Sequence, residues 1–241
     1  MKKLLKKFLQ FIGLDVQKVN RAPVVEFENE PDFNNLYDFA QEKTQMKYSD
    51  NIYRRQRHFT LQRLLNITDI NNGAVAECGS FRGLSAFQIS TILKKRNFGQ
   101  SFYIFDSFEG LSDFKDEDKQ KYKKIDYKKR QDEFSCDIDT VKSNLSDFSF
   151  IKYYKGWIPD RFKEVENQNF SFVHIDVDMY EPIKDCISFF YPRLEKGGFM
   201  VFDDYGFLGF PGAKKAIDEF FEKRDDVFLS LPSGQAFVIK K

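Results

Sequence analysis

Two acidic pairs follow two apolar segments of this chain. Asp176 and Asp178 lie in SFVHIDVDMYEP, and Asp203 and Asp204 end the apolar part of GGFMVFDDYG. Crowded like charges repel one another unless a cation or a proton joins them. Hard carboxylate oxygens at neighbouring strand ends are the ligands that a divalent metal such as Mg²⁺ uses. We therefore predict an enzyme whose chemistry takes place at this cluster.

A glycine-bearing turn, ECGSFRG, follows an earlier apolar segment and precedes a helical pattern. Glycines let the backbone turn tightly and approach a ligand, and a helix N-terminus beside the turn favours a carboxylate or a phosphate. Gly79 and Gly83 match neither the GxGxxG dinucleotide pattern nor a P-loop. The turn is thus either part of a ligand site or a tight strand-to-helix connection.

Two further candidates follow apolar segments. Asp106, at the end of SFYIFD and roughly 25–30 residues past the glycine turn, is placed to accept hydrogen bonds from ribose hydroxyls. The alternative is that Asp106 and Ser107 cap a turn or a helix. Trp157, in the Gly-Trp that follows FSFIKYY, is a candidate wall for an adenine ring or a core residue.

The elements that must position these residues alternate along the chain. Strands are expected at 73–78, 101–106, 148–154, 170–176 and 197–204, with helices near 84–96, 137–146, from Pro159, 182–194 and 213–223. This alternation predicts an α/β fold with a mostly parallel sheet that helices cover on both faces. VFLSLP and QAFVIKK predict a closing hairpin, which adds one antiparallel strand. Ligands bind at the carboxyl ends of strands in such folds, where all of these motifs lie.

The remaining segments flank or interrupt that pattern. Residues 1–60 are expected to form a helical lead-in, or cap, before a domain at 61–241. Residues 112–132 are dense in charge and predict a solvated insertion or a mobile lid. Residues 1–14 pattern as a basic amphipathic helix, which either rests weakly on an anionic membrane surface or docks on the domain or a partner chain. The lead-in helices could serve a homo-oligomer.

Composition restricts the class of protein. The 241 residues suffice for one large domain, and a net charge of +1 provides no strong field for nucleic acid. Three cysteines without metal-like spacing favour a reducing cytosol. No run is long and apolar enough for a membrane span. We expect a cytoplasmic protein, with the inner membrane face as a further location if residues 1–14 bind there.

In order, the motifs AECGSFRG, FDSFEGL, GW, HIDVDMYEP, YPRLEKGGFMVFDDYG and PGAKKAIDEF resemble the macrocin-type (TylF/MycF-like) metal-dependent O-methyltransferases. That family belongs to the class I S-adenosylmethionine methyltransferases and acts on sugar hydroxyls of macrolides and related products. The resemblance covers about residues 73–222. It implies a Rossmann-like sheet of seven strands, one of them antiparallel, with S-adenosyl-L-methionine and Mg²⁺ as cofactors.

The resemblance also implies roles for single residues. The residues implied to bind the cofactor are Glu77, Gly79, Ser80, Arg82, Gly83, Asp106, Ser107, Trp157 and Asp176. The family's Mg²⁺ positions fall on Asp176, Asp203 and Asp204, and Asp178 and Glu181 complete its D-x-D-x-Y-E pattern. Asp176 or Asp178 would act as general base, since Met179 occupies the position where related catechol enzymes carry a lysine. The family's Gly-Gly is Gly83-Leu84 here.

The implied reaction is methylation of a hydroxyl on a sugar, a glycosylated metabolite or another small molecule. Frequent Lys, Asn and Phe suggest an AT-rich bacterial genome, for which a surface polysaccharide precursor is an expected acceptor. Two rivals use the same kind of sheet: a nicotinamide-dependent oxidoreductase and a non-catalytic nucleotide-binding module. The missing dinucleotide fingerprint argues against the first, and the acidic cluster argues against the second.

Overall fold

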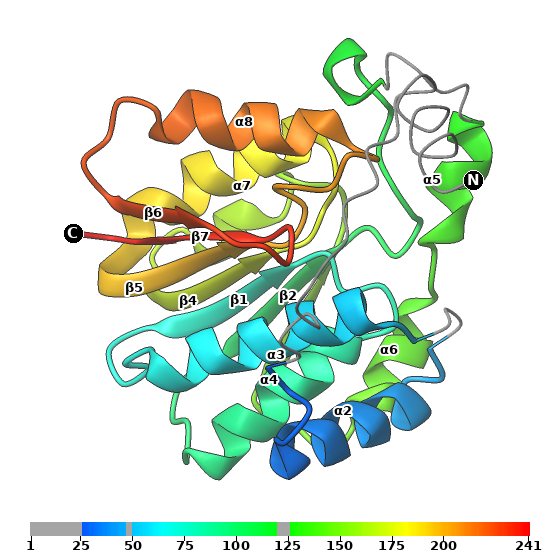
Figure 1. Cartoon of the computed structure of the whole chain (residues 1–241), viewed down its shortest axis with the longest axis vertical. Helices are drawn as coiled ribbons and strands as arrows, with labels where there is room; N and C mark the ends of the chain where they lie inside the picture. Colours follow the sequence, from blue (N-terminus) through cyan, green and yellow to red (C-terminus); the bar gives the residue numbers. More distant parts are fainter. Residues whose placement is uncertain (1–25, 47–49, 120–125) are drawn as a thin grey trace, which may run out of the picture.

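A seven-stranded sheet forms the centre of the molecule. The computed structural model describes residues 26–46, 50–119 and 126–241. The strand order is β3-β2-β1-β4-β5-β7-β6, and β7 runs antiparallel to both of its neighbours (Figure 1). The predicted α/β fold with one antiparallel strand is confirmed. The strands are β1 (Ala74–Cys78), β2 (Phe102–Asp106), β3 (Ile151–Lys155), β4 (Phe170–Ile175), β5 (Leu194–Phe202), β6 (Val227–Ser230) and β7 (Ala236–Ile239).

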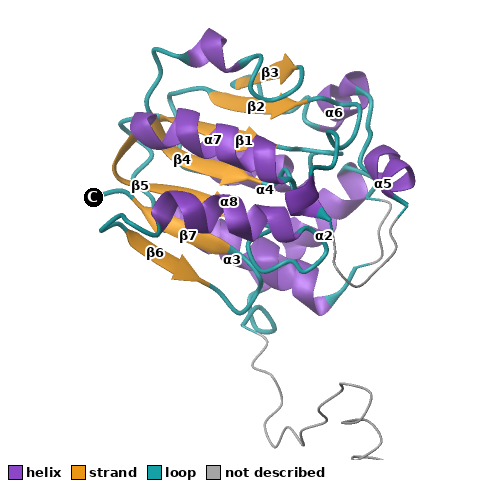
Figure 2. Cartoon of the chain, turned by 90° about the horizontal axis from the view of Figure 1, so that it is seen from above, coloured by secondary structure: helices purple, strands orange, loops and turns teal. Residues whose placement is uncertain are grey.

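Helices cover both faces of the sheet (Figures 1 and 2). One layer contains α2 (Pro31–Lys43), α3 (Ile52–Ile67), α4 (Leu84–Lys95) and α6 (Ile138–Asn144). The opposite layer contains α7 (Tyr180–Arg193) and α8 (Pro211–Phe221). Every residue of β1 and β4 is buried, as expected for central parallel strands between two helical layers.

The helices α2 and α3 share a hydrophobic core with the sheet. Tyr37 of α2 and Leu65 of α3 are fully buried, in the same cluster as Leu93 of α4 and Phe172 of β4. These two helices therefore form part of the layer that supports the strands. The division of the chain at residue 60 stays a prediction, and the helix predicted at residues 1–14 lies outside the described residues.

The structure corrects the sequence prediction in one segment and adds detail in another. The helix predicted from Pro159 is a turn followed by a short 3₁₀ helix, η2 (Phe162–Val165). Only Phe162 and Val165 are buried there, and a spacing of three residues needs no more than one turn. The 112–132 insertion contains a 3₁₀ helix, η1 (Asp116–Asp118), and the start of α5 (Tyr127–Glu133).

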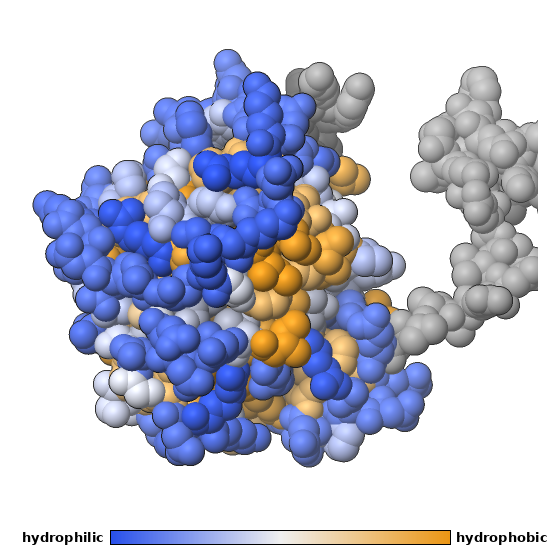
Figure 3. Space-filling view, turned by 90° about the vertical axis from the view of Figure 1, so that its left-hand side faces the viewer, coloured by the Kyte–Doolittle hydropathy of each residue, from blue (hydrophilic) through white to orange (hydrophobic). Residues whose placement is uncertain are grey.

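The surface is mostly hydrophilic on the face shown in Figure 3, with one apolar area. Exposed apolar side chains of the molecule include Val227 and Leu229 on β6, which is the edge strand of the sheet. Among the described residues, no helix combines the length and the apolar character needed to cross a membrane.

Candidate active site

One cavity of about 1060 Å³ lies at the carboxyl ends of the parallel strands. Its walls combine motifs that are far apart in the sequence. The predicted site residues that line it are Gly79, Ser80, Asp106, Ser107, Trp157, Asp176, Asp178, Asp203 and Asp204. The helix α3 and the 112–132 insertion also contribute lining residues, among them Arg57 and Lys115. The fold thus joins the glycine turn and the acidic pairs in a single space.

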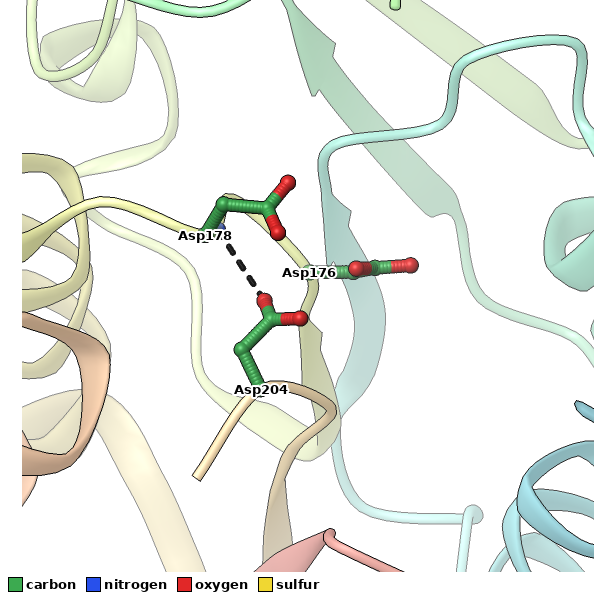
Figure 4. Close-up of side chains that lie close together, drawn as sticks. All are labelled: Asp176, Asp178 and Asp204. Atoms are coloured by element: carbon green, nitrogen blue, oxygen red, sulfur yellow. Dashed lines mark hydrogen bonds between the residues drawn. The ribbon is translucent and has the colours of Figure 1, made fainter. Parts of the chain in front are cut away.

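Three carboxylates of the acidic pairs converge (Figure 4). Asp176 directly follows β4, Asp178 lies two residues further, and Asp204 follows β5. One carboxylate oxygen of each lies within 4.8 Å of the others. The backbone N–H of Asp178 donates to Asp204 Oδ2 at 3.0 Å, and Asp178 has a left-handed φ of 59°. The tight turn after β4 brings the second acid of HIDVD back toward Asp204.

Burial makes this cluster costly to charge. Loss of hydration, followed by the charge of Asp176, raises the pKa of Asp178 to about 8. Burial and neighbouring carboxylates likewise raise the pKa values of Asp176 and Asp204. Protons or a cation must offset these charges, and three carboxylates are a suitable donor set for a hard divalent metal.

Asp203 is bound differently from the other three acids. Its Oδ2 lies 2.7 Å from Arg57 Nη1, and its Oδ1 accepts from Gln235 Nε2 at 2.8 Å. Burial alone would raise the pKa of Asp203, but the charge of Arg57, followed by the neighbouring His174, overcomes this and lowers it. The structure therefore directs Asp203 to an arginine on α3, while Asp178 takes the place beside Asp176 and Asp204. The assignment of Asp203 as a metal ligand stays a prediction.

A buried pair lies beneath the cavity. Glu77 Oε1 and His174 Nδ1 are 2.9 Å apart, and both side chains are almost fully buried. Burial alone would lower the pKa of His174, but its acidic neighbours Asp203 and Glu77 raise it to about 10. Within the described part of the chain, Glu77 Oε2 has no hydrogen-bond partner, and His174 Nε2 lies 3.8 Å from Asp203 Oδ1, beyond hydrogen-bond distance. The pair links β1 to β4 beside the acidic cluster; His174 lines the cavity, whereas Glu77 does not.

The glycine turn is shaped by its neighbours. Gly79 has a φ of +82°, and a Cβ there would lie 1.9 Å from the carbonyl oxygen of Asp176, so a side chain does not fit. Asp106 Oδ2 accepts from the backbone N–H groups of Ser80 at 2.6 Å and Phe81 at 3.1 Å. Its Oδ1 accepts from the N–H of Phe108 at 2.7 Å. Asp106 therefore caps this turn, as one of the two interpretations expected, and it also faces the cavity.

Two residues of the same motif face away from the cavity. Arg82 Nε donates to the carbonyl of Thr44 at 2.8 Å, at the end of α2. Gly83, with a φ of +87°, starts α4, and a Cβ there would lie 3.3 Å from Leu145. In this structure both residues join the turn to surrounding helices, and their contact with a cofactor stays a prediction.

Ser107 Oγ donates to the carbonyl of Gly110 at 2.9 Å.

Comparison with known proteins adds an independent observation. A family model described as Macrocin-O-methyltransferase (TylF) matches residues 33–227, which is most of the chain and includes α2 and α3. The chain belongs to the macrocin-O-methyltransferase (TylF) family. The resemblance stated from the motifs is confirmed, and the family match begins about 40 residues before the first of those motifs.

Curated proteins and solved structures resemble the chain to different extents. Demethyldecarbamoylnovobiocin O-methyltransferase of Streptomyces niveus is 24% identical over 158 residues, covering 64% of this chain and 60% of that protein. Mycinamicin III 3''-O-methyltransferase of Micromonospora griseorubida is 25% identical over 158 residues, covering 63% and 61%. The matched part thus spans about three fifths of each relative. The solved structure of the O-methyltransferase NovP superposes with a TM-score of 0.65 and 20% identity, covering 80% of this chain and 83% of that one, and supports the fold.

Proposed function

We propose that this TylF-family protein is an S-adenosylmethionine-dependent O-methyltransferase that acts on a hydroxyl of a sugar or a glycosylated metabolite. The observation that carries the proposal is the single cavity that joins the glycine turn and Asp106 to the acidic cluster. A methyl donor and an acceptor must occupy adjoining parts of one site, and the cavity is as large as the upper range of small-molecule sites. The names of the two curated relatives, both O-methyltransferases, support the reaction class.

The residues on one side of the cavity suit the cofactor. Gly79 keeps the backbone free of a side chain at the strand end, Asp106 offers carboxylate oxygens near the turn, and Trp157 offers an aromatic face. Together with Ser80 and Ser107 they would hold S-adenosylmethionine, which supplies the methyl group when bound. Acidic residues at this position after the second strand suit ribose hydroxyls.

The acidic cluster suits a divalent cation, for which we propose Mg²⁺. Asp176 and Asp204 belong both to the converging group and to the triad implied by the resemblance. The third ligand is Asp178 according to the geometry of this structure, or Asp203 according to the resemblance. When bound, the cation would lower the pKa of the acceptor hydroxyl.

The chain itself would orient the acceptor and remove its proton. Asp178 or Asp176 accepts the proton of the reacting hydroxyl as general base. The new bond joins the acceptor oxygen to the methyl carbon, the carbon–sulfur bond breaks, and S-adenosylhomocysteine leaves. Holding the oxygen and the methyl carbon in line lowers the entropic part of the reaction barrier. A surface polysaccharide precursor remains our proposed acceptor.

Labelled methyl transfer tests the proposal. The purified protein is incubated with methyl-labelled S-adenosylmethionine and a panel of nucleotide-linked sugars and polysaccharide fragments, with Mg²⁺ or after EDTA treatment. We expect transfer to a sugar hydroxyl that EDTA abolishes and Mg²⁺ restores. Calorimetry with S-adenosylhomocysteine and with NADH separates the rivals, since tight binding of NADH alone would favour the oxidoreductase. Transfer that is unchanged in EDTA would contradict the role of the cation.

Replacement of Trp157 by alanine is expected to weaken S-adenosylhomocysteine binding about tenfold. An aromatic stacking contact with its buried area contributes about 1–1.5 kcal/mol, and 1.4 kcal/mol corresponds to a factor of ten. Isothermal titration calorimetry measures the change. Trp157→Phe, which keeps an aromatic face, is the matched control and should bind within about threefold of the wild type. Equal affinities of wild type and Trp157→Ala would remove Trp157 from the cofactor site.

A further inference from the structure

Asp118 is a fully buried carboxylate in a segment that is otherwise rich in exposed charge. It is the last residue of η1, and both of its oxygens accept hydrogen bonds. Oδ2 accepts from the backbone N–H of Lys115 at 3.0 Å, which closes the turn of η1. Oδ1 accepts from the backbone N–H of Tyr180 at 2.8 Å, although the two residues are 62 positions apart. A carboxylate buried at this depth requires specific hydrogen-bond partners in the fold.

One of these partners lies at the N-terminus of α7, which begins at Tyr180. The N-cap residue of that helix is Met179, whose side chain makes no capping hydrogen bond, so α7 has no cap of its own. The first N–H groups of a helix lack partners within the helix and carry partial positive charge. Asp118 supplies the missing acceptor and a negative charge from another part of the chain.

The helix α8 leaves room for this carboxylate. Gly212 is the second residue of α8, and a Cβ there would lie 2.1 Å from Asp118 Oδ1. An ion pair joins η1 to α8 at the same place, since Lys215 Nζ lies 3.3 Å from Glu117 Oε1. Asp118 is thus the point where η1, α7 and α8 meet, and a glycine is required beside it.

We propose that Asp118 is a positioning residue for the reaction. Tyr180, which it holds, lies two residues after Asp178, so the cap determines where the turn with the acidic cluster ends. Lys115, which it also holds, lines the cavity from the insertion. By binding the N–H groups of Lys115 and Tyr180, Asp118 fixes the position of the insertion relative to the acidic cluster. The kinetic consequence rests on the proposed methyltransferase function, whereas the structural consequence can be measured without it.

Asp118→Ala tests the inference in two ways. We expect kcat/KM for the acceptor to fall about 10–100-fold, the range typical of residues that orient active-site ligands, while the Kd for S-adenosylhomocysteine changes less than about threefold. Hydrogen–deuterium exchange should become faster in peptides that contain Tyr180 or residues 110–119, and stay unchanged in peptides from β1 and β4. The matched control is Glu117→Ala, which removes the neighbouring ion pair and should leave kinetics and exchange unchanged.

Gly212→Ala is a second variant that leaves Asp118 itself in place. Alanine is favoured over glycine within a helix, so it should be neutral or stabilising unless its Cβ displaces the carboxylate or the adjoining Tyr180, whose Cβ would lie 2.9 Å away. We expect the same exchange pattern and the same loss of kcat/KM as in Asp118→Ala. If both variants keep wild-type exchange at Tyr180, or if cofactor affinity falls as steeply as acceptor kcat/KM, the inference is overturned. If the wild type transfers no methyl group, the proposed function fails, and the exchange data alone then support or reject the cap.

Discussion

Replacement of Asp204 by asparagine is expected to slow methyl transfer at saturating S-adenosylmethionine by about 10³-fold. Asp204 belongs to both candidate sets of metal ligands, and its side chain lies beside Asp176 and Asp178. Loss of one carboxylate from a cation site removes about 4 kcal/mol of transition-state stabilisation, which corresponds to that factor. The asparagine oxygen can still accept from the N–H of Asp178, so the turn should persist. Initial rates across a range of Mg²⁺ concentrations measure the effect.

Two further variants identify the third ligand. Asp178→Asn and Asp203→Asn are titrated with Mn²⁺, with Asp204→Asn as the reference. The variant whose affinity for Mn²⁺ falls as it does in Asp204→Asn identifies the third ligand. Asp160→Asn is the control, because Asp160 is exposed and lies outside the cavity lining. An Asp204→Asn protein that retains more than about a tenth of wild-type turnover with Mg²⁺ would be incompatible with the proposed site.

The second large effect concerns stability. Arg57→Ala should lower the free energy of unfolding by about 2–3 kcal/mol, because it leaves the carboxylate of Asp203 buried without its cation. The side chain of Asp203 is 8% exposed and that of Arg57 is 29% exposed, so solvent screens part of the interaction. For a fully buried pair, the loss of one partner costs about 3–5 kcal/mol. Urea unfolding followed by circular dichroism gives the value.

Arg63→Ala is the matched control for this experiment. Arg63 lies on the same helix and pairs with Glu30, but the two side chains are 54% and 39% exposed. Exposed pairs of this kind contribute at most about 1 kcal/mol. If Arg57→Ala and Arg63→Ala cost the same, the Arg57–Asp203 pair does not stabilise the fold as we infer.

The sequence was sufficient to predict the sheet and the location of the motifs. In a parallel sheet the strands end at one edge, so residues such as Gly79, Asp106, Asp176 and Asp204 meet there even though they are distant in the chain. Each motif can also be recognised from the local sequence, because glycines and paired acids interrupt apolar runs. This local pattern is why the family resemblance and the site could be recognised together.

The contacts that select among these acids could not be predicted. Asp203 and Asp204 are adjacent and chemically identical. Contacts from distant segments separate their roles in the structure: Arg57, 146 positions earlier, and Gln235 bind Asp203, whereas the N–H of Asp178 binds Asp204. Asp118 lies in a charged stretch that resembles any solvated loop, and its burial depends on the absence of a side chain at Gly212. Such contacts depend on tertiary packing between two distant segments, and neither segment's sequence carries a periodic pattern that would reveal the contact.

The contacts of Gln235 have a consequence for how the molecule is made. Its Nε2 donates to Asp203 and to the backbone carbonyl of Arg57 at 3.2 Å, so it contacts both residues of their ion pair. During synthesis Arg57 emerges from the ribosome long before Asp203, and Gln235 emerges after both. The sheet can begin to assemble earlier, but this charge pair gains the hydrogen bonds of Gln235 only once the β6–β7 hairpin has been translated and docked.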